Sequence, residues 1–485
     1  MLLVDYKVGR LFMKDMEKEL ECGKILPLVF KLTIPAVIAQ LITFLYNIVD
    51  RIFVSKIEGV GMDALAALGI VLPITLIITA FAHLIGLGGS PRASFKLGEG
   101  DKQEANKIFN TSFVLLSMIG LAISLITFFL AEQIVVLFGC PPTSVSFATS
   151  YLKIYSIGTI FVLLAQGLNP FITAQGYSLM AMFSVLIGAL VNIALDPIFI
   201  FVLKMGVNGA SLATIISQFI SFVWIIIFFY TKNSIFKLRI KDMRLQWKRI
   251  LCIMSLGLSP FIMAITECAI QIVFNINLNI STGGNKDYTA ALTIMMSALQ
   301  LISLPLNGLG YGMQPFVSYN FGKGDVKRLK TGIKYVTIIA FIFAVVVWSI
   351  SISVPEIYVY IFSASESVKV ICKQYTPFFL MGSIMFFVQM TLQNINVALG
   401  QTRNSLLLAV MRKVIILIPL CFTLTHFLGF KGVYLSEGIA DLVAGIITSI
   451  VIFTTFPRIF KKREKIVQQN QNATCNEDSN INSND

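Results

Sequence analysis

Two stretches of this 485-residue sequence decide its fold: Pro91-Arg-Ala-Ser-Phe-Lys-Leu-Gly-Glu-Gly-Asp101 and Pro315-Phe-Val-Ser-Tyr-Asn-Phe-Gly-Lys-Gly-Asp325. They share the proline, the serine, both glycines and the aspartate, and the aromatic Phe95 matches Tyr319. The two members of each pair are separated by the same number of residues as Pro91 and Pro315. We call this separation the repeat offset. A motif of this length that recurs at one spacing indicates an internal duplication.

The duplication extends over most of the chain. Further pairs keep the repeat offset to within one position: Gly86 with Gly310, Gly88 with Gly312, Pro35 with Pro260, and Gly206-x-x-Gly209 with Gly429-x-x-Gly432. Because the register drifts so little, the two halves are expected to share one design.

The composition is that of a membrane protein. Hydrophobic residues make up 56% of the chain and charged residues only 13%. The apolar residues form runs long enough for a helix to cross a hydrocarbon core of about 30 Å, which takes about 20 residues. Twelve such runs cover approximately residues 27–50, 64–89, 108–131, 150–173, 178–203, 207–231, 250–279, 288–313, 332–354, 374–398, 405–428 and 433–456. The sequence predicts an all-α integral membrane protein with twelve transmembrane helices in two pseudo-symmetric six-helix lobes.

This reading divides the chain into five parts. They are a cytoplasmic N-terminal segment 1–26, an N-lobe 27–231, a basic cytoplasmic loop 232–249, a C-lobe 250–457, and a polar, disordered cytoplasmic tail 458–485. With both termini inside, the cytoplasmic segments hold 29 Lys and Arg residues and the external segments hold eight. This asymmetry follows the positive-inside rule, so the net charge of +13 does not predict nucleic-acid binding.

An even number of spans per half makes the two halves parallel repeats, which is typical of transporters that carry substrate between their lobes. The sequence has no G-x-x-x-x-G-K-[ST] phosphate loop, no H-E-x-x-H and no nucleophile elbow. Seven cysteines stand singly without metal-ligand spacing. We therefore expect a transporter without a cofactor, driven by an ion gradient or by the gradient of its own substrate, and not an enzyme.

Polar residues within the predicted N-lobe spans are candidates for function, since an ionisable group at mid-bilayer costs about 2.5–3.5 kcal/mol. The first span carries a one-faced stripe of Gln40, Thr43, Asn47 and Asp50. The fifth carries Asn192 and Asp196, directly before Pro197. Counting from the outer turns at about 1.5 Å per residue puts Asp50, Asp196 and Thr214 at a similar depth. Their oxygens suit a proton or a small hard cation such as Na⁺, although an interfacial Asp50, a helix-end Asp196 and simple packing of Thr214 remain alternatives.

The C-lobe spans carry their own polar residues. Glu267, Gln271 and Asn275 recur every four residues, and Glu437 and Asp441 lie one turn apart. Gln389, Gln393 and Asn394 cluster in the tenth span. Polar contacts between helices are the alternative for each amide.

These features resemble the multidrug and toxic compound extrusion (MATE) family, and within it the DinF/MepA-like branch. The resemblance covers roughly residues 25–457. It rests on Tyr46-Asn-Ile-Val-Asp50, on the duplicated P-x-x-S-x-x-x-G-x-G-D loops and on Asn192-Ile-Ala-Leu-Asp196-Pro197.

The resemblance implies a cation or proton site at Asp50, Asn192, Asp196 and Thr214, with Asn169 as a further member, although depth counting places Asn169 in the cytoplasmic half. Glu267 matches a cation-binding acid of NorM-like relatives, whereas the tenth span here has amides and no acid. Gln40, Asn47, Glu267, Gln271, Gln389 and Asp441 are candidates for the substrate cavity or for a second-lobe site.

The resemblance also implies an antiporter of the bacterial inner membrane that exports amphipathic organic cations in exchange for H⁺ or Na⁺. We expect a monomer whose cavity is lined by aromatic and Met side chains with few fixed charges. The alternative is a flippase of the same superfamily that moves a lipid-linked saccharide, with a strongly cationic cavity.

Overall fold

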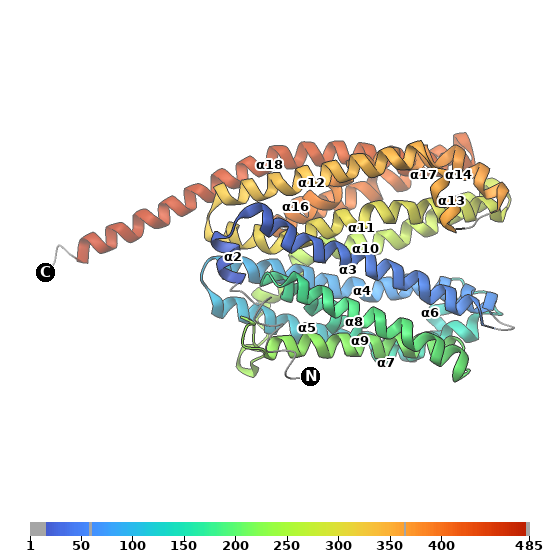
Figure 1. The fold of residues 1–485 in the computed structure, drawn as a ribbon, viewed down its shortest axis with the longest axis horizontal. Helices are drawn as coiled ribbons and strands as arrows, with labels where there is room; N and C mark the ends of the chain where they lie inside the picture. The colour runs from blue at the N-terminus through green and yellow to red at the C-terminus, as the bar shows by residue number, and fades with distance from the viewer. Residues whose placement is uncertain (1–15, 58–60, 363–364, 482–485) are drawn as a thin grey trace.

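A computed structural model describes residues 16–57, 61–362 and 365–481, and the helices of this part run side by side in two bundles (Figure 1). Of the predicted N-terminal segment, residues 1–15 lie outside the described part. We call the end of the molecule that carries the loop 232–246 and the duplicated loops the basic end.

The first bundle is the predicted N-lobe, preceded by a short helix α2 (Met16–Cys22). Its elements are α3 (Ile25–Ser55), α4 (Gly61–Gly98), α5 (Lys102–Phe129), α6 (Ala131–Leu137), α7 (Val145–Ala174), α8 (Ser178–Pro197), the π-helical η1 (Ile198–Val202) and α9 (Val207–Tyr230). The loop to the next bundle contains one 3₁₀ turn, η2 (Ile240–Asp242).

The second bundle is the C-lobe. Its elements are α10 (Trp247–Thr282), α11 (Lys286–Lys323), α12 (Val326–Ser353), α13 (Glu356–Phe362), α14 (Glu366–Phe379), the 3₁₀ η3 (Met381–Met385), the π-helical η4 (Phe387–Leu392), α15 (Gln393–Ala398), α16 (Thr402–Val410), the π-helical η5 (Met411–Leu417), α17 (Ile418–Leu428) and α18 (Phe430–Ile481).

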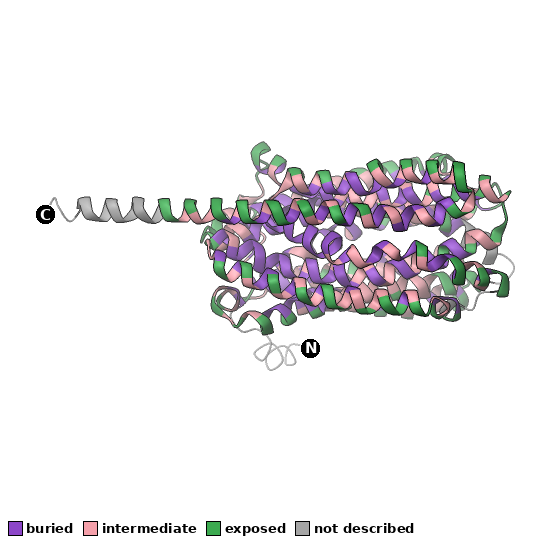
Figure 2. Cartoon of the chain, turned by 90° about the horizontal axis from the view of Figure 1, so that it is seen from above, coloured by how far each residue is buried: buried purple, intermediate pink, exposed green. Residues whose placement is uncertain are grey.

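The twelve predicted spans are present. In the described part of the chain, eleven helices are long and apolar enough to cross a membrane, and a bent pair makes the twelfth. This pair, Glu366–Met385 and Phe387–Ala398, turns by 41° within the tenth predicted span. Large apolar side chains such as Leu125, Ile342 and Ile450 are exposed. Exposed residues recur along the helices on the outside of the bundles, which suits contact with lipid (Figure 2).

The duplicated loops form the same structure twice. Gly100 and Gly324 adopt φ values of +83° and +85°, which favour glycine. The following residues, Asp101 and Asp325, each accept a hydrogen bond of 2.9 Å from a backbone N–H in the first turn of the next helix. The repeated Gly-x-Gly-Asp sequence is therefore a left-handed turn followed by an N-cap.

The two lobes meet through this repeat. A Cβ atom on Gly98 would lie 2.0 Å from the carbonyl oxygen of Tyr319, and one on Gly322 would lie 2.1 Å from that of Phe95. The repeat offset relates Gly98 to Gly322 and Phe95 to Tyr319, so each contact is the counterpart of the other. This reciprocity means that a pseudo-twofold axis relates the two lobes. The same reciprocity relates the packing of α10 on α4 to that of α3 on α11.

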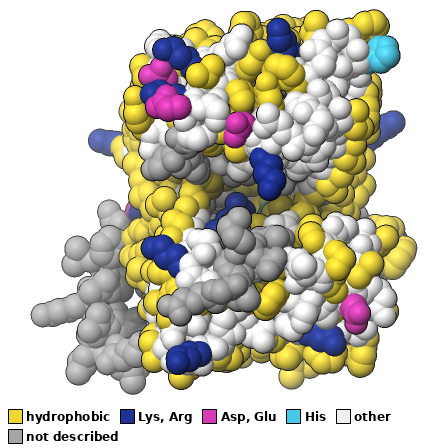
Figure 3. Space-filling model, turned by 90° about the vertical axis from the view of Figure 1, so that its right-hand side faces the viewer, with side chains coloured by type: hydrophobic (Ala, Val, Ile, Leu, Met, Phe, Trp, Pro, Cys, Tyr) yellow, Lys and Arg dark blue, Asp and Glu magenta, His cyan; other side chains and the backbone are white. Residues whose placement is uncertain are grey.

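These inter-lobe contacts are tight over the half of the molecule near the basic end. At the opposite end, Figure 3 shows a furrow between the lobes. The structure therefore holds the lobes together at the basic end and apart at the other.

The sequence predicts a disordered tail from residue 458. The structure differs, because α18 continues as a helix beyond this residue. The guanidinium of Arg463 lies over the rings of Phe95 and Phe321, at 5.2 and 5.6 Å from their centroids. Its Nε donates a 2.8 Å hydrogen bond to the Phe321 carbonyl. Glu464 pairs with Lys330 at 3.1 Å. These contacts with the duplicated loops hold the first turns beyond 457 in a helix.

Helix α2 also spans the lobes. Glu17 pairs with Lys102 of the N-lobe at 2.7 Å, and Glu21 pairs with Lys323 of the C-lobe at 2.9 Å. Both α2 and the extension of α18 therefore cross the closed basic end.

Candidate functional site

The polar residues of the N-lobe come together between α3, α7, α8 and α9. Asp196 is fully buried and Asn192 is 2% exposed, one turn earlier on α8. The Asn192 amide donates a 3.3 Å hydrogen bond to the Asp196 carboxylate. Asp50 lies within electrostatic range of Asp196. The two carboxylates, which come from two different spans, therefore influence each other electrostatically.

A tyrosine that the sequence reasoning missed joins this cluster to Thr214. The Tyr151 side chain, on α7, interacts with Thr214 and lies within electrostatic range of Asp50 and Asp196. The Ser211 hydroxyl anchors α9 on α7 through a 2.9 Å hydrogen bond to the Tyr151 carbonyl. Aromatic residues are common in apolar spans, so the sequence offered no signal for Tyr151.

Three oxygens of the cluster are buried without a hydrogen-bond donor from the described residues. They are Asp50 Oδ1, Asn192 Oδ1 and Asp196 Oδ2. A buried acceptor without a partner costs about 1–3 kcal/mol, so such atoms in one cluster indicate a place for a proton or a bound cation. Among the described residues, no three His, Cys, Asp or Glu side chains are arranged to hold a metal ion. The donor set here is two carboxylates, one amide and one hydroxyl.

Asn169 is not part of this cluster. Its amide donates hydrogen bonds of 2.8 Å to the Ala181 carbonyl and 2.6 Å to the Ser184 hydroxyl, near the start of α8. Because Asn192 lies about two turns beyond Ser184 on α8, the two sites lie about 12 Å apart along the helix axis. Depth counting therefore placed Asn169 correctly, and the residue match to the family did not.

The stripe on α3 is less strongly organised. Thr43 donates to the Ala39 carbonyl at 3.0 Å, and Asn47 donates to the Thr43 carbonyl at 2.8 Å. Both bonds stay within the helix, and Gln40 lies half-buried two turns before Asn47. Of the stripe, we assign only Asp50 to the cluster.

The C-lobe holds a second group of charges, which we call the C-lobe ion cluster: Glu267, Arg412, Lys413, Glu437 and Asp441. Arg412 pairs with Asp441 at 2.7 Å and with Glu437 at 3.6 Å. Lys413 lies 3.3 Å from both Glu267 and Glu437. The C-lobe therefore buries charged side chains of both signs within its predicted spans.

Arg412 and Lys413 escaped the sequence reasoning, which counted them with the cytoplasmic loops. Both residues lie on η5, within about three turns of the start of α16. At about 1.5 Å per residue, they are at most about 17 Å from that start along the helix axis. Without these two, 27 of the 29 basic residues remain in the inside segments against eight outside, and the bias persists. Two adjacent basic residues within the apolar run 405–428 were the signal.

Of the other C-lobe candidates, Gln389 contacts this cluster. The Gln389 side chain donates a hydrogen bond to the Asp441 carbonyl, and its own Oε1 is buried without a partner from the described residues. Gln271 lies one turn beyond Glu267 on α10. The Arg412 guanidinium also lies 5.0 Å from the centre of the Phe386 ring.

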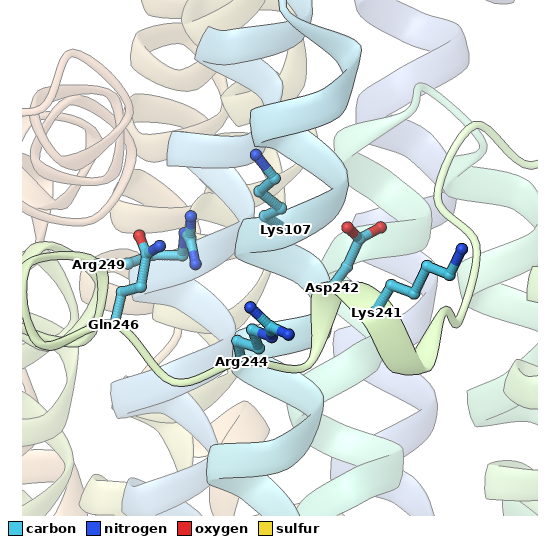
Figure 4. A pocket seen from close by; sticks show the side chains of 6 residues that line it. All are labelled: Lys107, Lys241, Asp242, Arg244, Gln246 and Arg249. Atoms are coloured by element: carbon cyan, nitrogen blue, oxygen red, sulfur yellow. The ribbon is translucent and has the colours of Figure 1, made fainter.

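A separate cavity of about 420 Å³ lies at the basic end, where the inter-lobe loop meets α5 (Figure 4). Lys107, Lys241, Arg244 and Arg249 line it together with Asp242. Arg249 is already paired with Glu104 at 2.9 Å, and Asn106 donates to Asp242 at 2.7 Å. Four of its six lining residues are basic, so this cavity is unsuited to hold a cation.

The fold and these clusters define a two-lobed membrane protein with charged groups buried in both lobes, and comparison with known proteins places it in a family. The MatE family model matches residues 35–198 and 251–423. The multidrug export protein MepA of Staphylococcus haemolyticus is 29% identical over 441 residues, covering 90% of this chain and 95% of the relative. MepA of Staphylococcus aureus is 26% identical over 440 residues, with the same coverage.

Solved structures agree on the fold. An outward-facing MATE family transporter of the MOP superfamily superposes with a TM-score of 0.83 at 22% identity, covering 93% of this chain and 98% of that one. A MOP superfamily transporter from Pyrococcus furiosus gives 0.82 at 22% identity, with the same coverage. The chain therefore belongs to the MatE family, on its MepA-like branch.

Proposed function

We propose that this protein is a secondary-active exporter of amphipathic organic cations, driven by H⁺ or Na⁺ that enters through the N-lobe. The observation that carries the proposal is the cluster of Asp50, Asn192 and Asp196, in which three buried oxygens lack a donor within the described chain. The names of the MepA relatives support multidrug export as the transported class.

The coupling ion acts on the charge of the N-lobe cluster. Two carboxylates this close resist joint ionisation, so one of them takes up a proton readily, or both share a small cation. The positive-inside bias supports an orientation in which the basic end faces the cytoplasm. The furrow at the other end then faces outward, and the ion reaches the cluster from outside.

Drug and ion are linked because they favour different states of the lobes. A ligand with equal affinity for two states shifts neither. Neutralisation of the Asp50–Asp196 pair allows α3 to bend at or near Pro35, which changes the wall of the space between the lobes and releases the drug outward. Each charge that enters through about 100 mV supplies about 2.3 kcal/mol, enough for about fifty-fold accumulation of drug.

A lipid-linked saccharide flippase is the less favoured function. Its phosphate-bearing substrate needs a cationic cavity, whereas the C-lobe ion cluster carries three carboxylates for two basic groups. A net negative cluster within the span favours cationic substrates instead.

Purified protein in vesicles tests the proposal directly. Ethidium should move against its gradient when an inward H⁺ or Na⁺ gradient is imposed, and the effective ion identifies the driver. Wild-type protein that moves a fluorescent lipid-linked saccharide, but no ethidium under either gradient, would refute the exporter and support the flippase.

A further inference from the structure

The C-lobe ion cluster differs in accessibility from one member to the next. The side chains of Glu437 and Asp441 are 0% and 1% exposed, and those of Lys413 and Arg412 are 6% and 10% exposed. The Glu267 side chain is 37% exposed. Glu267 is therefore the most exposed charged side chain of the cluster.

The cluster is also one positive charge short. With all groups ionised, three carboxylates face one guanidinium and one ammonium, which leaves a formal charge of −1. An uncompensated charge within a membrane span is costly, so one additional monovalent cation stabilises the group. Glu267, the most exposed of the three carboxylates, is the one that an additional cation can reach most readily.

Lys413 is shared between two carboxylates. Its Nζ lies 3.3 Å from Glu267 Oε2 and 3.3 Å from Glu437 Oε1. If Glu267 pairs with another cation, the Lys413 ammonium still pairs with the buried carboxylate of Glu437. The second oxygen of that carboxylate, Oε2, has no hydrogen-bond partner among the described residues and can also accept from the ammonium. The exchange leaves no stranded charge.

We propose that Lys413 is a tethered cation that occupies the C-lobe carboxylate site, and that an organic monocation binds by displacing it from Glu267 onto Glu437. An apolar side chain adjoins the site: Met263 lies one turn before Glu267 on the same face of α10 and accepts a 3.4 Å hydrogen bond from Gln393. The site therefore offers a carboxylate to the charge and apolar surface to the body of the ligand.

This inference rests on the proposed export of organic cations and assigns Glu267 and Lys413 opposite effects on affinity. Glu267 contacts the ligand and should strengthen binding. Lys413 competes with the ligand, so its presence should weaken binding and limit the site to cations able to replace an ammonium.

The test measures binding of tetraphenylphosphonium, whose charge is permanent, and of neutral triphenylphosphine oxide to purified full-length protein by calorimetry. Glu267→Gln should weaken tetraphenylphosphonium binding at least tenfold and change triphenylphosphine oxide binding less than twofold. The control Glu356→Gln removes a carboxylate of the same lobe that pairs with Lys373 at 2.7 Å, outside the cluster, and should change neither.

The competitor role is tested with the charge-balanced double variant Lys413→Gln/Glu437→Gln, which keeps the formal charge at −1 and leaves Glu267 without its ammonium. It should bind tetraphenylphosphonium five- to tenfold more tightly than wild type. Lys413→Arg offers Glu267 a bidentate partner and should weaken binding, so the test does not depend on the folding of the double variant.

The outcomes separate the two proposals. If wild type neither binds nor exports tetraphenylphosphonium, the proposed function fails. If wild type does both, and Glu267→Gln binds as wild type or loss of the Lys413 ammonium fails to tighten binding, only the displacement of Lys413 is overturned.

Discussion

Gly257 offers a direct way to disturb the contact between the lobes at the basic end. A Cβ atom on this residue of α10 would lie 1.7 Å from the Leu84 carbonyl oxygen on α4, where real Cβ contacts stay beyond 3.0 Å. Gly257→Ala therefore requires the two helices to move apart. The obstacle is backbone, so no side-chain rotation can relieve it.

The added methyl group raises the free energy of the state in which α10 and α4 are in contact. Overpacking a tight contact costs about 1–3 kcal/mol, which disfavours that state by about five- to 150-fold relative to states with the lobes apart at this end. We expect Gly257→Ala to shift the population toward an open basic end and to slow ethidium efflux, since alternation needs both states.

Spin labels at Gln103 and Lys327 can report this shift. These exposed residues lie in the first turns of α5 and α12 and correspond under the repeat offset. Electron–electron distance measurements on a cysteine-free background should show a longer component in Gly257→Ala. The matched control is Gly69→Ala in α4, where a Cβ atom would meet nothing within 4 Å. A distance distribution for Gly257→Ala that equals both wild type and the control would refute the reasoning.

Three further predictions follow from the charged groups. Asp50→Asn or Asp196→Asn should abolish ethidium efflux from cells at wild-type protein levels, because an amide cannot change charge with the coupling ion; normal resistance in both variants would contradict the role of the cluster. Arg412→Leu strands buried carboxylates and should destabilise the protein by about 3–5 kcal/mol, measured as a lower midpoint of thermal unfolding in detergent; an unchanged midpoint would show that the ion pair with Asp441 is not stabilising. Arg463→Gln should loosen the contact of α18 with both lobes and lengthen the same spin-label distance without changing drug affinity; an unchanged distance would mean that this arginine does not hold the basic end closed.

The interpretation of α18 shows how far composition can mislead. The segment after residue 457 is polar, and polarity alone predicts a solvated, disordered tail. Arg463 instead packs over two aromatic rings of the duplicated loops and donates hydrogen bonds to two of their backbone carbonyls. Those partners belong to other helices far away in the sequence, so no local pattern could have indicated them.

The class of fold, the two-lobe organisation and the candidate acids of the N-lobe could all be predicted from the sequence. Length and hydropathy set the number of spans, because a helix must satisfy its backbone within the bilayer whatever its neighbours are. The internal repeat defined the lobes, and helical rise alone brought Asp50, Asp196 and Thr214 to one depth.

The groups that meet across helices could not be predicted from the sequence, because they depend on how the helices pack. The structure added Tyr151 to the N-lobe cluster, removed Asn169 from it, and joined Glu267 to Lys413 and Arg412 to Asp441. Depth along a span can be counted from the sequence, but the direction in which each side chain points depends on how helices rotate and bend against one another. The π-helical η5, which carries both Arg412 and Lys413, shows this because a π turn changes the rotation of every residue that follows it.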